Sequence, residues 1–200
     1  MAGSPSRRTQ EQRRAEAERR VVGAAIGLIA RAGSRGMTLA QVGEAAGYSR
    51  GIVYHHFGSR ERLLEAVVDE AQRFEVPAGE GDGLGHLVRL VEAYLRNIGR
   101  RTPEARAFLQ LWGEAIAADP VLEPLFARRD ADFRGELAGM VRRGVADGTV
   151  RADVDAEAAA VLLLALLRGS GLQLIAEPPV GRLDVLVREA ARSVRAAFGA

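Results

Sequence analysis

The side chains best suited to chemistry in this 200-residue chain gather between residues 49 and 60, and they favour binding over catalysis. Arg50, Tyr54 and His55 follow each other at helical spacing, with Arg60 close behind. An arginine can donate two hydrogen bonds to a guanine, and tyrosine or histidine can bond to phosphate. A catalytic centre is poorly supported, because the chain has no Cys, only three His and no glycine-rich phosphate loop. We therefore expect no enzyme activity.

Two short helices must position these side chains. Thr38 is a good N-cap for a helix whose apolar residues Leu39, Val42 and Ala46 lie on one face. Gly47 ends that helix, and Ser49 caps the next one at once. The second helix, residues 49–57, turns Ile52, Val53 and Phe57 inward and is too short to be stable alone. Two short helices across a tight glycine turn indicate a helix-turn-helix.

This segment resembles the DNA-binding domain of TetR-type transcriptional regulators, over roughly residues 18–70. The residues that carry the resemblance are Thr38, Ala46, Gly47, Ser49, Tyr54, Phe57, Arg60, Leu63 and Leu64. Two departures are mild: Gly43 replaces the usual Ala, at about 1 kcal/mol of helix propensity, and Arg60 replaces a frequent Lys. The resemblance implies a repressor that binds palindromic double-stranded DNA as a homodimer in response to a small, largely hydrophobic effector.

The resemblance and the pattern together give a set of expected DNA contacts. Arg50 would read guanine, while Thr38 and Arg60 stand at helix starts, where phosphate is favoured. Tyr48, in the turn, is equally consistent with a phosphate contact and with a place in the core. The full set is Thr38, Tyr48, Ser49, Arg50, Gly51, Tyr54, His55 and Arg60.

Charge is distributed unevenly along the chain. Residues 1–62 hold 11 Arg against 5 acidic residues, whereas residues 63–200 hold 17 Arg against 21 acidic residues. A basic head on an acidic body is typical of a DNA-binding protein. Metal binding is not expected, because His55 and His56 are neighbours that diverge on a helix and His86 stands apart. We expect no cofactor.

The long segments of the chain have helical periodicity, so we predict an all-α protein of about nine helices, with an N-terminal three-helix helix-turn-helix domain followed by a C-terminal helical domain. Residues 1–12 form a mobile basic arm, in which Arg7 and Arg8 either contact DNA or remain solvated. Residues 13–75 form the helix-turn-helix domain, and residues 76–200 form a helical domain for effector binding and dimerisation. The expected helices cover residues 13–32, 38–46, 49–57, 59–74, 84–100, 103–118, 120–147, 155–175 and 182–198.

Two further sites are expected in the second domain. Apolar side chains from three helices could line an effector pocket or simply fill a core: Leu90, Tyr94, Phe108, Leu111, Trp112, Phe126, Phe133 and Met140. The helix at 155–175 is apolar around its circumference, which favours burial in a dimer or at the centre of one subunit. The expected dimer residues are Leu163, Leu166, Gly169, Leu186, Ala190 and Val194.

Neither apolar run predicts export or a membrane span. Residues 21–30 make up only ten residues, and residues 156–167 fall short of the roughly 20 that a span needs. We therefore expect a cytoplasmic protein that is nucleoid-associated when DNA-bound. The alternative function is a DNA-binding helical protein without a small-molecule effector.

Overall fold

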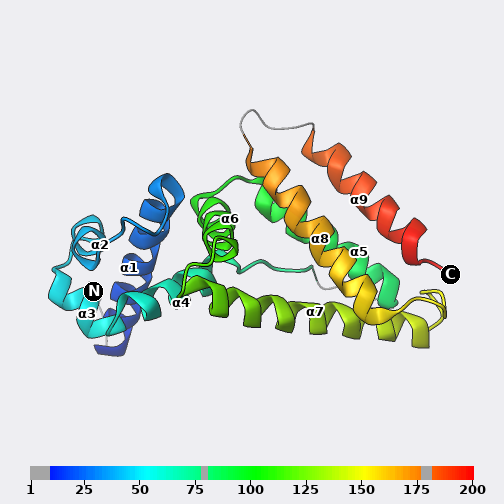
Figure 1. Ribbon diagram of the computed structural model, residues 1–200, viewed down its shortest axis with the longest axis horizontal. Helices are drawn as coiled ribbons and strands as arrows, with labels where there is room; N and C mark the ends of the chain where they lie inside the picture. The colour runs from blue at the N-terminus through cyan, green and yellow to red at the C-terminus, as the bar shows by residue number, and fades with distance from the viewer. Residues whose placement is uncertain (1–9, 78–80, 177–181) are drawn as a thin grey trace, which may run out of the picture.

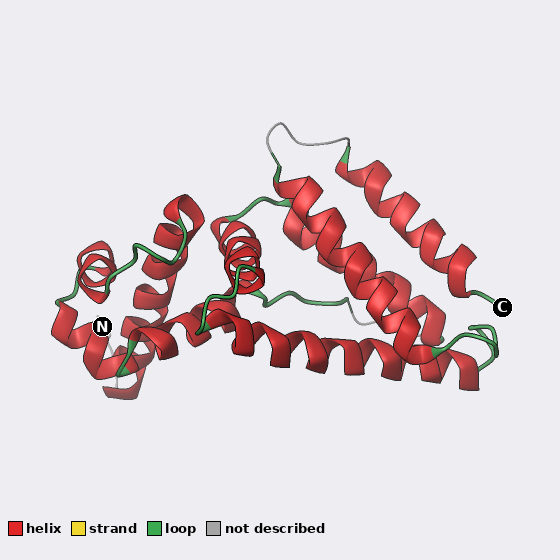
Figure 2. Cartoon of the chain, viewed as in Figure 1, coloured by secondary structure: helices red, strands yellow, loops and turns green. Residues whose placement is uncertain are grey.

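The computed structural model describes residues 10–77, 81–176 and 182–200. These residues form helices joined by turns and loops, with one isolated β-bridge between Val150 and Gly199 (Figures 1 and 2). This confirms the all-α prediction. The helices of the described residues are α1 (Gln10–Ala32), α2 (Leu39–Ala46), α3 (Arg50–Phe57), α4 (Arg60–Ala71), α5 (Gly83–Gly99), α6 (Pro103–Ile116), α7 (Leu122–Ala146), α8 (Ala156–Ile175) and α9 (Leu183–Phe198).

The first four helices form a small head at one end of the molecule (Figure 1). Helix α1 packs against α2 and α4, and α2 packs against α3. Their shared core consists of fully buried aliphatic side chains: Val21, Ile29, Val42, Val53, Leu63, Leu64, Val67 and Val68. Thr38 closes a capping box with Gln41, as the sequence predicts for the start of α2.

The larger body contains α5 and α7 to α9, and α6 lies between head and body (Figure 1). Helix α5 packs on α7, α8 and α9, and α8 packs along α7. Helix α6 contacts α1 and α4 on one side and α7 on the other. The head and the body are therefore joined through α6 rather than only by the chain between α4 and α5.

Two polar connections strengthen this junction. Ser34, fully buried in the loop after α1, donates to Glu114 of α6 through its backbone nitrogen (2.8 Å) and its hydroxyl (2.5 Å). Arg129 of α7 donates to Gln72 at the end of α4 (2.8 Å) and forms an ion pair with Asp69. A displacement of α6 or α7 would thus stretch or break hydrogen bonds to the head.

The expected helix boundaries differ from the structure by one to three residues at several ends, as at α4, which ends at Ala71 rather than near residue 74. Residues 10–12 belong to α1, so the expected arm of residues 1–12 is shortened, and the rest of it, with Arg7 and Arg8, lies outside the described residues. Helix α5 begins at Gly83 because Asp82 caps it. Gly83 also permits a close crossing, since a Cβ there would lie 2.3 Å from the nitrogen of Gly144 in α7.

The crossing of α2 and α3 makes Gly43 a test of this packing. A Cβ at Gly43 would lie 2.8 Å from the carbonyl oxygen of Tyr48. We predict that Gly43→Ala loses about 1–3 kcal/mol to overpacking, more than the roughly 1 kcal/mol gained in helix propensity. Thermal unfolding of the variant should therefore show a lower Tm than the wild type.

Gly23→Ala is the matched control. Gly23 lies inside α1, and a methyl group added there would meet no atom within 4 Å, so alanine at this position should raise the Tm. If Gly43→Ala proved as stabilising as Gly23→Ala, the close crossing of α2 and α3 would be contradicted.

Candidate nucleic-acid interface

The recognition element consists of α2, a tight turn and α3. Gly47 ends α2 with a left-handed backbone (φ 75°), and the Ser49 hydroxyl accepts a hydrogen bond from the Ile52 nitrogen (3.3 Å). Val53 is the one fully buried residue of α3. A single anchor of this kind leaves most of the α3 surface facing away from the core.

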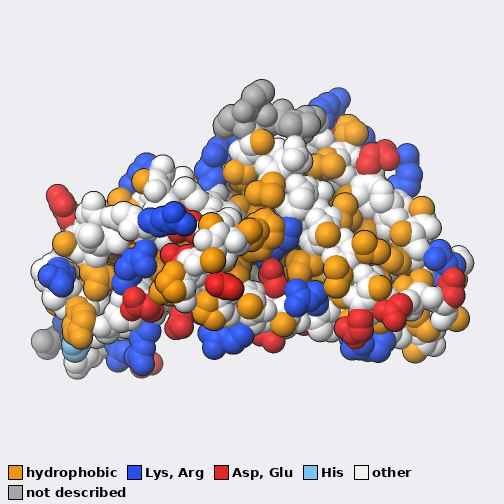
Figure 3. All heavy atoms as spheres, viewed as in Figure 1, with side chains coloured by type: hydrophobic (Ala, Val, Ile, Leu, Met, Phe, Trp, Pro, Cys, Tyr) orange, Lys and Arg blue, Asp and Glu red, His pale blue; other side chains and the backbone are white. Residues whose placement is uncertain are grey.

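The exposed surface of α3 carries most of the expected contacts. Ser49, Arg50, Gly51, Tyr54 and His55 are all exposed, and the Tyr54 side chain is 60% exposed. Arg50 and Tyr54 lie one helical turn apart, so they share a face. Histidine is visible at the outer end of the head, far from the body (Figure 3). This surface therefore offers donors and a phenol to a partner.

Ile52 does not lie where the sequence predicts it. The pattern places it in the core with Val53 and Phe57, yet it is 41% exposed, whereas Phe57 is half-buried. Eight residues offer too little periodicity to decide which side of α3 faces inward. An exposed isoleucine beside Arg50 is suited to contact a thymine methyl group.

Tyr48 and Thr38 have partners within the head. The Tyr48 ring packs against the core, and the Arg20 guanidinium lies 5.0 Å from its centroid while donating to the Ala46 carbonyl (2.8 Å). The Thr38 hydroxyl accepts from the Gln41 nitrogen (3.2 Å). Both residues thus support the motif's shape, and their contacts to DNA stay predictions.

Arg60 is directed into the head. Its Nη2 donates to the Ser34 carbonyl (2.6 Å), and its Nε donates to the Met37 carbonyl (3.4 Å). The guanidinium thereby holds the loop between α1 and α2 against the start of α4. The structure gives Arg60 a bracing role within the head, and its expected contact to phosphate stays a prediction.

Glu18 and His56 form a contact for which the sequence gives no signal, because they are 38 residues apart. The His56 Nδ1 lies 3.4 Å from a Glu18 carboxylate oxygen. The hydrogen bond from Arg14 is the largest cause that lowers the pKa of Glu18, and His56 adds to it. This contact ties the end of α3 to α1.

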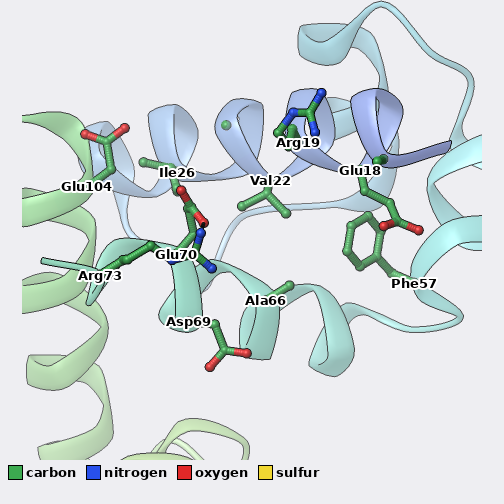
Figure 4. A pocket seen from close by; sticks show the side chains of 12 residues that line it. Glu18, Arg19, Val22, Ile26, Phe57, Ala66, Asp69, Glu70, Arg73 and Glu104 are labelled. Carbon is green, nitrogen blue, oxygen red and sulfur yellow. Dashed lines mark ion pairs between the residues drawn. The ribbon is translucent and has the colours of Figure 1, made fainter. Parts of the chain in front are cut away.

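Several hollows adjoin the head, among them one of about 950 Å³ between the end of α4 and α5, and two others bear on the expected sites. One, of about 470 Å³, lies between α1 and α4, where Val22 and Ile26 of α1 face Ala66 of α4 beneath a mixed set of acidic residues and arginines (Figure 4). The other, of about 350 Å³, lies where α4, α5 and α7 meet. Half of its lining is apolar (Phe74, Val76, Leu90, Phe133 and Met140), and the other half is polar or charged (Asp69, Gln72, Arg73, Arg129 and Glu136).

The expected effector residues therefore divide into two groups. Leu90, Phe133 and Met140 line the second hollow. Tyr94, Phe108, Leu111 and Phe126 are buried in the body and Trp112 is half-buried, with the rings of Phe108 and Phe126 5.6 Å apart. The second group packs the interior around Arg168, a buried residue that the sequence pattern does not single out.

The expected dimer residues need a correction. Leu163, Ala190 and Val194 are buried inside the single subunit, because α8 and α9 turn these side chains towards α5 and α7. Gly169 is exposed, and Leu166 and Leu186 are half-buried. The apolar residues that do face outward on α8 and α9 are Val161, Leu162, Leu172 and Val185.

Helix α8 is long and apolar enough to cross a membrane by length and composition alone. Eight of its 20 residues are nevertheless buried within the protein, which is typical of a core helix. Within residues 10–77, 81–176 and 182–200, no group of three or more His, Asp or Glu side chains is placed to hold a metal ion.

Comparison with known proteins matches both parts of the chain. Residues 21–67 match the family model of bacterial regulatory proteins of the tetR family, and residues 85–199 match the C-terminal domain of BetI-type transcriptional repressors. The transcriptional repressor AcnR of Corynebacterium glutamicum is 31% identical over 143 residues, which cover 68% of this chain and 70% of AcnR. The regulator CymR of Pseudomonas putida is 41% identical over 66 residues, or 33% of this chain and 32% of CymR.

Solved structures share the fold. A TetR regulator from Chloroflexus aurantiacus superposes with a TM-score of 0.79 at 22% identity, covering 94% of this chain and 98% of that one. A protein from Saccharomonospora viridis, solved in complex with choline, gives a TM-score of 0.73 at 24% identity, covering 93% and 99%.

The fold and the exposed α3 define a helix-turn-helix protein with a helical body attached. The chain belongs to the TetR family of bacterial transcriptional regulators, which confirms the resemblance seen in its sequence.

The two arginines of the motif should differ in their effect on stability. We predict that Arg60→Ala lowers the free energy of unfolding by about 1–3 kcal/mol, because it leaves the Ser34 carbonyl without its charged donor. Arg50→Ala should leave the Tm unchanged, since Arg50 is exposed. Differential scanning fluorimetry of both variants measures the difference.

Arg62→Ala is the control on the same helix, because Arg62 is exposed. An Arg60 variant as stable as the Arg62 variant would show that Arg60 does not brace the loop.

Proposed function

We propose that this chain is a ligand-responsive transcriptional repressor that binds a palindromic operator as a homodimer. It acts in the cytoplasm, on the nucleoid when DNA-bound, and works by binding rather than by catalysis. The observation that carries the proposal is the exposed face of α3, where Arg50 and Tyr54 project around a single buried anchor, Val53.

The exposed face of α3 has the size and chemistry for a major groove. An α-helix fits that groove, and Arg50 can donate two hydrogen bonds to the O6 and N7 atoms of guanine. Gly51 and Ile52 allow close approach and apolar contact, while Tyr54 and His55 are placed for phosphate or base contacts. Their combination supports base reading rather than electrostatic attraction alone.

A dimer is supported by the outer faces of α8 and α9. Val161, Leu162, Leu172 and Val185 are exposed apolar side chains from these two helices. Leu166 and Leu186 lie half-buried on the same helices. Two copies joined through such faces would form a four-helix interface and present two α3 helices to a palindrome.

An effector is supported by the hollow beside α4. A volume of about 350 Å³ is within the range of small-molecule sites, and Arg129 in its wall also bonds to α4. A ligand that binds one arrangement of α4 and α7 more tightly would shift the distance between the two α3 helices. The choline bound by the Saccharomonospora viridis relative is a precedent for a small molecule in this fold.

The alternative, a DNA-binding protein without an effector, is favoured by one observation. Most of the expected pocket residues, among them Phe108, Leu111 and Phe126, are buried side chains of a packed body. Both functions predict the same DNA binding. They differ only in whether a small molecule changes that binding.

The DNA prediction uses an operator selected from a random duplex pool by the wild-type protein. Its sequence should be an inverted repeat, and wild-type affinity should fall steeply with salt concentration. Arg50→Ala should weaken binding about 5- to 150-fold, because a bidentate base contact is worth about 1–3 kcal/mol. Tyr54→Ala should also weaken binding, because it removes a phosphate or base contact. Fluorescence anisotropy measures the Kd of each protein.

Arg151→Ala, an exposed arginine in the loop after α7, is the control for loss of positive charge. Weakening by Arg151→Ala equal to that by Arg50→Ala, with no change of selected sequence, would contradict base reading by α3.

The dimer prediction compares two variants of equal chemistry. Leu162→Arg on α8 should give a monomer in sedimentation equilibrium, because a charge would be desolvated at the interface. Ile116→Arg, on the exposed end of α6, should remain a dimer. The two side chains are 63% and 66% exposed, so both variants should keep the fold. A dimeric Leu162→Arg protein would place the interface elsewhere.

A further inference from the structure

Arg168 is an unusual residue for its position. It lies in α8, the most apolar helix of the chain, and its side chain is almost fully buried. Among the described residues, Ser34 and Arg168 are the only buried polar or charged ones. A buried cation is costly unless charge and hydrogen bonds compensate it, so the groups around Arg168 decide what this centre can bind.

The guanidinium has partners on three other helices. Its Nη2 donates to a carboxylate oxygen of Asp130 in α7 (2.7 Å), and its Nη1 donates to the Tyr94 hydroxyl in α5 (3.1 Å). The centroids of the Phe108 and Trp112 rings of α6 lie 4.5 and 5.8 Å from it. Its Nε is buried and has no hydrogen-bond partner.

The neighbours keep this centre polar but nearly uncharged. Burial raises the pKa of Tyr94, so its phenol stays protonated and neutral. The Trp112 Nε1 donates to the second oxygen of Asp130 (3.4 Å). Asp130 is therefore the one anion that the Arg168 guanidinium contacts among the described residues. The Arg168 Nε–H is a strong hydrogen-bond donor that has no acceptor.

The hollow beside α4 and this centre are linked by shared helix faces. Leu90 and Tyr94 lie one turn apart on α5, as do Phe133 and Asp130 on α7, so each pair shares a helix face. The Phe74 ring, which lines the hollow, lies 5.6 Å from the Tyr94 ring. Tyr94, Asp130 and Arg168 do not line the hollow themselves, so a ligand whose apolar body lies there reaches Arg168 only when side chains of the intervening layer move aside.

We propose that the effector of this regulator is a small carboxylate with an apolar body. Its carboxylate accepts hydrogen bonds from the Arg168 guanidinium in exchange for Asp130, and its body occupies the hollow lined by Leu90, Phe133 and Met140. This inference rests on the proposed function. Guanidinium and carboxylate match in geometry, and the pair is strengthened by the buried surroundings.

The same geometry excludes a quaternary ammonium ligand at this centre. Aromatic rings and a carboxylate are the groups that hold such a cation, but here the chain's own guanidinium occupies the space between Phe108, Trp112 and Asp130. A cationic ligand would meet a like charge. In this respect the chain should differ from its choline-bound relative.

The exchange also has a direct route to the head. Asp130 is adjacent in sequence to Arg129, which bonds to Asp69 and Gln72 of α4. Release of Asp130 from Arg168 would free this turn of α7, and α4 follows α3 after only Gly58 and Ser59. The ligand would thus bias the position of α3 through a contact that it replaces.

Asp130→Asn provides the sharpest test, because it removes the internal anion and leaves Arg168 buried without its charge partner. The probes are benzoate, phenylacetate and 3-phenylpropionate, each beside its own amide, and 2-phenylethylammonium. Calorimetry should show at least one carboxylate binding to Asp130→Asn at least 10-fold more tightly than to the wild type, with its amide unaffected. The ammonium should not bind either protein.

Two further variants control for structure. Asp132→Asn, an exposed change on the same helix, should bind the carboxylates as the wild type does. Arg168→Met should lose the preference for carboxylate over amide. If Arg168→Met does not fold, the carboxylate affinities of Asp130→Asn and Asp132→Asn still show whether Asp130 competes with the ligand for Arg168. Equal affinity of Asp130→Asn for every carboxylate and its amide would overturn the proposal.

Operator binding separates this proposal from the proposed function. In one outcome, the wild-type protein binds its selected operator but Asp130→Asn shows no preference for carboxylates. The proposed function would then stand, and the carboxylate effector would be wrong. Wild-type protein that binds no duplex would contradict the proposed function, whatever the probes do in the body.

Discussion

The function proposed for this protein depends on a helix that cannot hold its shape alone. Helix α3 has eight residues, and helices of that length are unstable in water. Its order comes from the Ser49 cap, the buried Val53 side chain and the close crossing with α2 at Gly43. Because so few groups hold α3, the rest of its surface is free to carry side chains for a partner.

The head and the body are joined by polar contacts at a packed junction. Ser34 is held by Glu114 of α6, while Arg60 holds the same loop from α4. On the other side, Arg129 connects α7 with the end of α4. Under the proposed function, these short, directional bonds are the route by which a ligand in the body would act on α3.

The sequence is sufficient to predict the fold and the motif, since both rest on local signals. Thr38, Gly47 and Ser49 act in the structure as the cap and turn residues that their types predict. Periodicity is insufficient to predict the burial of a side chain where that burial depends on which neighbouring helix covers its face. It places Ile52 in the core and Leu163, Ala190 and Val194 on a surface, whereas packing reverses each of these. Contacts between distant residues, such as Arg168 with Asp130, have no sequence signal.

The most direct measurement is methylation interference on the selected operator, because methylation of guanine N7 modifies the atom that Arg50 should contact in the major groove. The account predicts interfering guanines in two symmetric groups about one helical turn apart, with interference lost in Arg50→Ala. Interference confined to adenine N3 in the minor groove, or one unpaired group of guanines insensitive to Arg50, would contradict the reading of DNA by α3.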